Sequence, residues 1–406
     1  MSSASTTARK TNDAIALSPG KTKLCTALLV IMGFALGSSE FAVIGIESEL
    51  ANDLGVSLSA IGQLISLFAL PYAIMTPILA LTTGRFKRYS LLKVYCVVFI
   101  VGNLIAALAT SYGMLLFARI VMGTVAGTLL AVGTTYIPEL VGTERMGFVI
   151  SVVYGAYSVA MIVATSLGKI AADAFNWHVV MWATFVLSLA VGIALLAVMP
   201  RSGSTDEPAT FKEQFGLLKE PCILIGMLIF VFGVGAVYVF YGFVTPYLEQ
   251  ILGMDTVAAS TTLLAFGAIC LVSNLTGGWI DTRFGMPAVP VIFVLLAVVL
   301  GSITLAGGAM PISLVLVFGV ALLMYTFSIA CITLFMRIAH GRHPKAMTLA
   351  TSIEPMAFNI GIAFGSAVGG LIIAGPGIIT CGAFGAAFSL IAAALAVITI
   401  RFSKKL

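Results

Sequence analysis

The stretch LCTALLVIMGFALGSSEFAVIGI at residues 24–46 decides the class of this protein, because its 23 residues include one charged side chain, Glu40. A helix of about 20 apolar residues is long enough to cross the hydrocarbon core of a bilayer. Residues 1–23 are polar and contain neither an apolar signal-peptide core nor a cleavage site of small residues. Residues 24–46 are therefore predicted to be an uncleaved first span that follows a cytoplasmic N-terminal tail.

The rest of the chain repeats this apolar pattern. Hydrophobic residues make up 60% of the 406 residues and charged residues only 9%, against about 25% charged residues in ordinary soluble domains. A single soluble core stops growing well below this length. The further predicted spans are 62–81, 91–109, 114–137, 148–168, 179–198, 222–244, 261–280, 289–305, 312–336, 347–374 and 380–400. We predict an all-α membrane protein with twelve transmembrane helices.

The positions of lysine and arginine agree with twelve crossings and indicate their orientation. These residues concentrate on the cytoplasmic side of membrane proteins. Nineteen of the 21 fall at the termini or at the even-to-odd connections; the exceptions are Arg119, inside a span, and Lys169, at an outer helix end. Both termini are therefore expected in the cytoplasm, with the chain in the inner (plasma) membrane. The net charge of +5 is expected to face anionic lipid and not nucleic acid.

A polar stretch divides the chain into two halves of six spans. Residues 200–220 are rich in Gly, Ser, Thr, Asp and Pro, which indicates a cytoplasmic linker. TGRF at 83–86 follows the second span, and DTRF at 281–284 follows the eighth span 198 residues later. Six-helix repeats that face each other enclose a substrate site near the middle of the membrane. The predicted domains are an N-terminal bundle, 24–199, and a C-terminal bundle, 221–406.

Short motifs follow one another in order along almost the whole chain. They are GSSEF at 37–41, DLGVS at 53–57, Arg119 with Gly123 and Gly127, Tyr241 with PYL at 246–248, GG at 277–278, RFG at 283–285, and FNIG at 358–361 with Gly365, Gly369 and Gly370. With these motifs the chain resembles the twelve-spanner drug:proton antiporter branch of the major facilitator superfamily, near the arabinose-efflux-permease-like proteins. The resemblance implies two six-helix bundles related by a pseudo-two-fold axis.

Two motifs depart from the family pattern. Thr83 stands where the inner-loop motif has an acidic residue, and in the second copy Asp281 lies one position early. The fifth-span motif, which the family associates with antiport, usually has Gly and Pro where this chain has ATS at 164–166, followed by Gly168 and Lys169. Proton-linked uptake therefore stays open as an alternative to export.

Glu40 and Glu354 are the two acidic residues inside the predicted spans. A carboxylate in hydrocarbon is costly, so intramembrane acids usually face the protein interior and mark proton or ion paths. Glu40 and Arg119 both lie roughly 8–9 Å below the outer ends of their helices, at about 1.5 Å per residue. Because the resemblance places the first and fourth spans side by side, we predict a Glu40–Arg119 ion pair. It is expected either to break or hydrate during transport, or to lock helix packing.

Glu354 lies eight residues into the eleventh span and is followed by Pro355. A proline inside a helix frees a carbonyl group and bends the helix, which indicates a point that water can reach. Glu354 is expected to contribute to proton coupling or to the recognition of cationic substrates. The alternative is a carboxylate that extends to the cytoplasmic surface.

Polar and aromatic side chains share faces of the seventh and tenth spans. Tyr238, Tyr241 and Thr245 have the i, i+3, i+7 spacing of one helical face. Their hydroxyl groups would lack partners against lipid. An aromatic wall with few polar groups suits a small amphipathic ligand, although hydrogen bonds between helices would explain the same residues. The predicted cavity residues are Tyr238, Tyr241, Thr245, Tyr325, Ser328 and Asn359.

The basic inner-loop residues and the glycine seams are assigned to conformational roles. The residues of the conformational inner-loop motif are Arg85, Lys87, Arg88, Asp281 and Arg283. The basic run at 85–88 mainly reflects the membrane topology, and it is expected in addition to latch the two halves on the inner side. Glycines let neighbouring helices approach closely, so the seam formed by Gly361, Gly365 and Gly369 is expected to be a packing surface.

These patterns favour a secondary active transporter that exports a small amphipathic organic molecule, drug-like or sugar-like, in exchange for protons. The motifs H-E-x-x-H, G-x-S-x-G and G-x-x-x-x-G-K-[ST] are absent from the sequence, so an intramembrane enzyme or an ATP-driven pump is not expected. A sensor without transport activity would not need two buried carboxylates. We expect no cofactor, no metal site and no disulfide, and a transporter that works as a monomer by alternating access.

Overall fold

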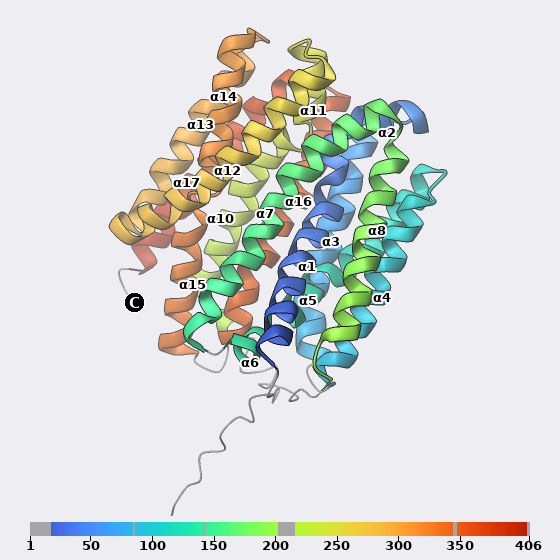
Figure 1. Cartoon of the computed structure of the whole chain (residues 1–406). Coiled ribbons are helices and arrows are strands. Elements are labelled where there is room, and N and C mark those ends of the chain that lie inside the picture. The colour runs from blue at the N-terminus through green and yellow to red at the C-terminus, as the bar shows by residue number, and fades with distance from the viewer. Residues whose placement is uncertain (1–17, 84–85, 142, 202–215, 344–346, 404–406) are drawn as a thin grey trace, which may run out of the picture.

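The computed structural model describes residues 18–83, 86–141, 143–201, 216–343 and 347–403. Across these residues the regular structure is helical, and none of them forms a β-strand. Most of the N-terminal tail, most of the linker and Arg85 lie outside the described residues. The helices are long and stand roughly side by side (Figure 1).

Within the described residues, twelve helical segments are long and apolar enough to cross a membrane, which confirms the predicted number. The helices of the first six spans are α1 (Pro19–Gly45), α3 (Leu58–Thr83), α4 (Arg88–Ala107), α5 (Tyr112–Thr134), α7 (Thr143–Ala174) and α8 (Trp177–Val198). The helices of the last six are α10 (Pro221–Tyr241), α12 (Thr256–Phe284), α13 (Val289–Ala306), α14 (Met310–Leu323) with α15 (Ser328–Arg342), α16 (Met347–Ala374) and α17 (Cys381–Ser403). Short elements cap several spans: α2 (Glu47–Leu54), α6 (Ile137–Val141), α11 (Val244–Pro246), η1 (Tyr247–Ile251), η2 (Met286–Ala288) and η4 (Ile378–Thr380).

The helices pack as two groups that meet along two seams. In the first half α1 packs on α7 and α8, and α5 packs on α3 and α4. In the second half α10 packs on α16 and α17, and α13 packs on α14 and α17. The two halves touch where α3 packs on α16 and where α7 packs on α12. Residues that face the middle of the molecule therefore come from α1, α3, α5 and α7 on one side and from α10, α15 and α16 on the other.

The tenth span differs from the predicted continuous helix 312–336. It is interrupted at residues 324–327, between α14 and α15. The interruption leaves the Tyr325 amide without a helical acceptor, and it donates a hydrogen bond to Ser273 Oγ of α12 at 2.9 Å. Irregular backbone is tolerated at membrane depth only where protein or water satisfies its polar groups. Ser273 thus helps to hold an irregular segment that carries a tyrosine.

The predicted glycine seam is a packing surface, as expected. Gly365 of α16 lies so close to α10 that an added Cβ atom would be 2.6 Å from the carbonyl oxygen of Gly235. Gly361 and Gly369 face the α10 backbone in the same way, next to the carbonyl oxygens of Phe230 and Val239. These glycines fix the close contact between α10 and α16, and they line no ligand site.

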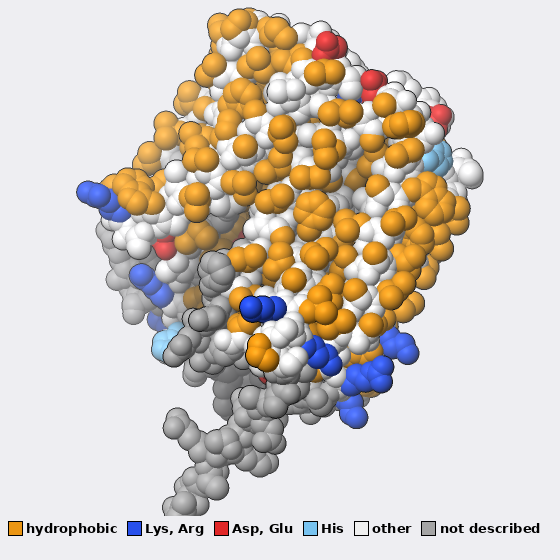
Figure 2. All heavy atoms as spheres, viewed as in Figure 1, with side chains coloured by type: hydrophobic (Ala, Val, Ile, Leu, Met, Phe, Trp, Pro, Cys, Tyr) orange, Lys and Arg blue, Asp and Glu red, His pale blue; other side chains and the backbone are white. Residues whose placement is uncertain are grey.

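The two ends of the molecule carry side chains of different charge. Figure 2 shows Lys and Arg mainly along the lower part of the view, Asp and Glu mainly along the upper part, and hydrophobic side chains over the surface between them. The end at which α1 begins, near Lys87, Arg88 and Arg342, is called the basic face below. The end that carries α2 and η1 is called the opposite face.

Candidate functional site

Glu40 lies in the last third of α1, at the centre of the molecule. Its side chain is buried, with 5% of the residue exposed, and its carboxylate accepts a hydrogen bond from the hydroxyl of Tyr157 on α7. The carboxylate is also within electrostatic range of Tyr238 and Tyr325, which belong to the second half. Glu40 therefore faces the interface between the two halves.

Arg119 holds the backbone of α1 and α3 and does not bind the Glu40 carboxylate. Its Nη1 donates to the carbonyl oxygen of Ser39 at 2.6 Å, its Nη2 to the carbonyl oxygen of Glu40 at 2.9 Å, and its Nε to the carbonyl oxygen of Leu64 at 3.0 Å. The guanidinium also lies over the ring of Phe68, 4.3 Å from the centroid. The predicted direct ion pair is therefore absent from this conformation: one N–H of each guanidinium nitrogen is bonded to a main-chain carbonyl group and Tyr157 binds the carboxylate, although Arg119 lies within electrostatic range of the Glu40 carboxylate.

We expect Arg119→Lys to lower the stability of the protein although it keeps the charge. An ammonium group cannot reproduce a planar fork that reaches three carbonyl groups on two helices. Losing one charged hydrogen bond should cost about 1.5–3 kcal/mol of the free energy of unfolding. The loss of stability is measured as a fall in the apparent melting temperature in detergent. Asp173→Asn, at an exposed position of α7, is the control variant. An unchanged melting temperature would mean that these hydrogen bonds do not hold α1, α3 and α5 together.

Glu354 of α16 lies on the other side of the interface. It is partly exposed and within electrostatic range of Tyr72 on α3, Tyr154 on α7 and Tyr325. Over the described parts of the chain, no side chain forms a hydrogen bond or an ion pair with its carboxylate. Tyr154 is 44% exposed, so this side of the interface is less tightly packed than the surroundings of Glu40. Glu354 is thus an uncompensated carboxylate surrounded by phenol groups.

Aromatic rings from the second half complete the surroundings of Glu354. Tyr325 is stacked on Phe358 of α16, with ring centroids 5.8 Å apart and ring planes inclined by 4°. Tyr238 contacts the edge of the same Phe358 ring at a centroid distance of 6.5 Å. The group formed by Glu40, Tyr154, Tyr157, Tyr325, Glu354 and Phe358 is called the central site below.

The other predicted cavity residues take different positions. Thr245 belongs to α11 on the opposite face, where its hydroxyl donates to the carbonyl oxygen of Ile44 at 2.6 Å; it joins the two halves and is not part of the central site. Tyr241 is buried and stacked on Phe266 at 4.9 Å. Ser328 is buried next to the interruption of the tenth span, and Asn359 is buried in α16. Each has one side-chain oxygen without a described hydrogen-bond partner. The Asn359 amide donates to the carbonyl oxygen of Pro355 at 3.0 Å.

Three tyrosines of the first half were missed by the sequence analysis. Tyr154 and Tyr157 are three residues apart on α7, which is the same spacing that singled out Tyr238 and Tyr241 on α10. Tyr72 of α3 is buried within electrostatic range of both Glu40 and Glu354. The spacing in the fifth span could have revealed the α7 pair, whereas Tyr72 is recognisable only once α3 is placed against α16.

Four of the five inner-loop residues, all except Arg85, lie among the described residues, at the basic face. Arg88 forms an ion pair with Glu139 of α6 at 2.6 Å. Asp281 accepts a hydrogen bond from Thr333 of α15 at 2.8 Å, and Arg283 lies over the ring of Trp279. Lys87 directly precedes α4. A role for these residues as a latch between the halves stays a prediction.

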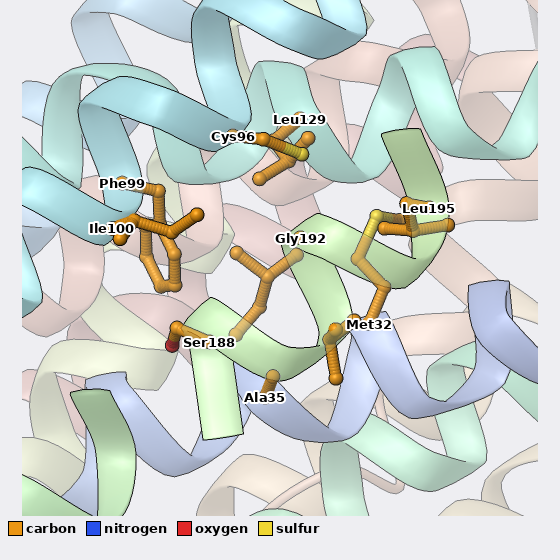
Figure 3. A pocket seen from close by; sticks show the side chains of 11 residues that line it. Met32, Ala35, Cys96, Phe99, Ile100, Leu129, Ser188, Gly192 and Leu195 are labelled. Atoms are coloured by element: carbon orange, nitrogen blue, oxygen red, sulfur yellow. The ribbon is translucent and has the colours of Figure 1, made fainter. Parts of the chain in front are cut away.

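Two cavities lie away from the central site. One, of about 20 Å³, lies inside the first half between α1, α4, α5 and α8, and its lining is apolar except for Ser188 (Figure 3). That is about the space of one water molecule. A second cavity, of about 660 Å³, lies at the basic face between the end of α12 and α15, where Asp281 and Arg337 line it. Neither cavity contains Glu40 or Glu354.

The two halves are joined by polar contacts on the opposite face. Ser48 of α2 donates to Glu249 Oε2 of η1 at 2.7 Å, and Lys169 of α7 forms ion pairs with Glu49 and Glu249. Deeper in the molecule, Ser66 of α3 donates to the carbonyl oxygen of Ala363 of α16 at 3.0 Å. The protein is therefore closed on the opposite face in this conformation.

Comparisons with known proteins agree with this architecture. The family model for the Major Facilitator Superfamily matches residues 28–354. The chain is 27% identical over 355 residues to the uncharacterized MFS-type transporter YtbD of Bacillus subtilis, covering 86% of this chain and 89% of that protein. It is 25% identical over 348 residues to the putative transporter AraJ of Escherichia coli, covering 85% of this chain and 86% of that protein.

A resistance protein and a solved structure are also similar. The chain is 26% identical over 345 residues to the chloramphenicol resistance protein of Streptomyces lividans, covering 84% of this chain and 87% of that protein. The crystal structure of a bacterial homologue of the human lysosomal transporter Spinster, in an inward-facing and occupied conformation, has a TM-score of 0.79 at 15% identity, covering 95% of this chain and 98% of that chain. The family resemblance of the sequence motifs is confirmed. The chain belongs to the Major Facilitator Superfamily and is a membrane transporter, not an enzyme.

Proposed function

We propose that this transporter exports a small amphipathic organic molecule in exchange for protons, by alternating access. The observation that carries the proposal is the pair of carboxylates, Glu40 and Glu354, that face the same interface from opposite halves: neither makes a direct ion pair in the described structure, and Arg119 acts on Glu40 only at a distance. Structural carboxylates at membrane depth are normally paired. Two carboxylates without a direct ion pair can take up and release protons when their hydration changes.

The geometry supports an exchange between protons and substrate at the central site. Glu40 is hydrogen-bonded to Tyr157 of its own half and is close to Tyr238 and Tyr325 of the other half. Movement of the two halves apart would change the surroundings of the carboxylate from aromatic rings to water. A buried carboxyl group prefers to be neutral and a hydrated one prefers to be ionised. Protonation of Glu40 would therefore depend on whether the carrier is open at the basic face or at the opposite face.

Similarity to a resistance protein supports export as the direction. We assign the basic face to the cytoplasm, because cytoplasmic loops carry an excess of Lys and Arg. The opposite face, closed by Lys169 and its partners, is then the outer face, and the structure is inward-facing. An exporter loads its substrate from this state and an importer releases its substrate there, so the conformation itself is compatible with both directions. The named function of the Streptomyces lividans relative, chloramphenicol resistance, favours export over proton-linked uptake.

The central site favours a ligand that has an aromatic or otherwise flat apolar part. The parallel rings of Tyr325 and Phe358 and the accessible ring of Tyr154 offer large apolar surfaces, while polar groups are few, as is typical of small-molecule sites. The uncompensated Glu354 carboxylate favours a positive charge on that ligand. We therefore propose an organic cation as the preferred form of the substrate.

Transport into everted membrane vesicles tests the function and the direction together. Vesicles that contain the protein are given an inside-acid pH gradient, and uptake of tetraphenylphosphonium, ethidium or chloramphenicol is measured against vesicles without the protein. Export predicts accumulation that collapses when a protonophore is added. Depletion of the probe from these vesicles as protons flow out would favour the uptake alternative. An absence of gradient-dependent movement across a wider panel of probes would contradict proton coupling.

A further inference from the structure

One lysine and three glutamates meet at the outer face, away from the central site. Lys169 of α7 is buried, with 2% of the residue exposed, and it forms ion pairs with Glu49 of α2 and Glu249 of η1. Glu249 belongs to the second half and also accepts the hydrogen bond from Ser48. The contact therefore joins the halves. We call Glu47, Glu49, Lys169 and Glu249 the outer gate.

Glu47 is the member of the outer gate that has no partner. It is the first residue of α2 and has 0% of its surface exposed. Neither of its carboxylate oxygens makes a hydrogen bond within the described structure, although both are buried. An ionised carboxylate in such a place would carry a desolvation cost of several kcal/mol, which proteins usually avoid by keeping the group neutral.

The negative charges near Glu47 also favour its neutral form. Burial raises the pKa of the Glu47 carboxyl well above its ordinary value, the like charges of Glu49 and Glu249 raise it further, and Lys169 opposes them. Burial also raises the pKa of Glu49, although the hydrogen bond from Lys169 lowers it. With all three acids ionised, one lysine would face three negative charges. One proton on the gate halves that imbalance, from a net charge of about −2 to about −1.

The remaining polar groups near the gate do not supply the missing charge. Tyr241 of α10, whose hydroxyl lies within electrostatic range of Glu47, is neutral. Asp53, also on α2, accepts a hydrogen bond from Trp177 Nε1 of α8 at 2.7 Å and is directed to that helix. Lys169 is thus the one cation among the described groups that act on Glu47.

We propose that Glu47 is a second proton-binding site of the transporter: it is neutral while the outer gate is closed and ionised once the gate has opened. The proton comes from the side that the gate faces, because the opening of that face is what hydrates the carboxyl group. This site is separate from Glu40 and Glu354, and it does not require that transport itself be proton-coupled.

The sign of the pH effect follows from linkage. The closed gate holds a proton on Glu47 to a higher pH than the open gate does, so the closed state binds more protons. Raising the pH favours the state that binds fewer protons. Alkaline conditions outside should therefore open the gate, and acid outside should return the carrier to the inward-facing state. For a single proton, the closed-to-open ratio changes by at most about tenfold per pH unit.

Distance measurements between spin labels on the two halves test the gate directly. Labels are attached at Asn52→Cys on α2 and Val257→Cys at the start of α12, which are both exposed. The six native cysteines are buried. The experiment is done in lipid nanodiscs from roughly pH 5 to pH 9, in a Glu40→Gln/Glu354→Gln background that removes titration of the central site. The separated population should grow with pH, and in Glu47→Gln it should stay small at every pH.

Two controls make the result specific to Glu47. Glu49→Gln removes a partner of Lys169, so it should enlarge the separated population at every pH while the pH dependence remains. If Glu49→Gln removes the pH dependence and Glu47→Gln does not, the titrating group is Glu49 and the proposal is overturned. Infrared difference spectra give a second readout, in which a carboxyl C=O band from the protonated acid should disappear in Glu47→Gln. Absence of that band from the parent protein at neutral pH would also overturn the proposal.

Discussion

Replacing Glu40 with Gln is expected to abolish accumulation of substrate against its gradient while exchange of substrate across the membrane continues. Gln keeps the shape of the side chain and can still contact the Tyr157 hydroxyl, but it cannot take up or release a proton. One proton moving down a potential of 100 mV and one pH unit supplies about 3.7 kcal/mol, enough for a concentration ratio of about 500 for a neutral substrate. In Glu40→Gln this ratio should fall to about one for a neutral probe, because no proton movement drives it.

The measurement compares two assays on the same everted vesicles. Gradient-driven accumulation of a neutral probe, for which chloramphenicol is the first choice, should be lost, whereas counterflow of labelled against unlabelled probe without a pH gradient should remain. Asp173→Asn, an acid-to-amide change at an exposed position of α7, is the matched control and should accumulate the probe as the parent does. Accumulation by Glu40→Gln with the parent's pH dependence would remove Glu40 from the coupling mechanism.

Glu354→Gln is expected to weaken binding of cationic probes selectively. The carboxylate has no described cation of its own, so a positively charged ligand would be its ion partner at the site. Interactions of hydrogen-bonding groups with a charge are worth about 1.5–3 kcal/mol, which corresponds to a loss of roughly 10- to 150-fold in affinity for a cation. A neutral probe that relies on the rings of Tyr325 and Phe358 should lose little.

Competition experiments measure this selectivity. The apparent affinity for tetraphenylphosphonium is compared with that for chloramphenicol in the parent, in Glu354→Gln and in Glu354→Asp, which keeps the charge. The aspartate variant should retain most of the preference for the cation. An equal loss for both probes would indicate that Glu354 supports the structure of α16, and no loss for either would place substrate binding away from this carboxylate.

The membrane topology could be predicted from the sequence because hydrophobicity and charge act over whole helices. A span of about 20 residues must avoid charge whatever its neighbours are, and all twelve predicted spans overlap spans of the structure. The interruption of the tenth span was not predictable in this way. Residues 324–327, Met-Tyr-Thr-Phe, contain no glycine, proline or charged residue that would indicate a break, and the hydrogen bond that accompanies the break runs from Tyr325 to Ser273, which lies in another helix.

The central site was predicted in part, since acids in hydrocarbon stand out in any sequence. The position of each residue along its helix correctly predicted that Arg119 lies at the level of Glu40. It could not show which atoms of Glu40 the guanidinium would reach. The carbonyl groups of Ser39, Glu40 and Leu64 supply one acceptor for each guanidinium nitrogen, and main-chain acceptors carry no signal in a sequence. Thr245 was misplaced for a related reason: α10 ends at Tyr241, so the helical spacing no longer applies four residues later.

The interrupted tenth span has a consequence for how selective this carrier can be. A side chain on a continuous helix can change direction only among a few rotamers, because its backbone is held by the hydrogen bonds of every turn. Tyr325 stands on a short segment outside α14 and α15 whose amide is bonded to the side chain of Ser273 and not to a helical carbonyl group, so the backbone beneath the ring is held by fewer hydrogen bonds than a helical turn and can readjust while α14 and α15 keep their lengths. A wall of this kind accommodates ligands of differing outline with one set of residues, and we expect this protein to accept a broad range of compounds.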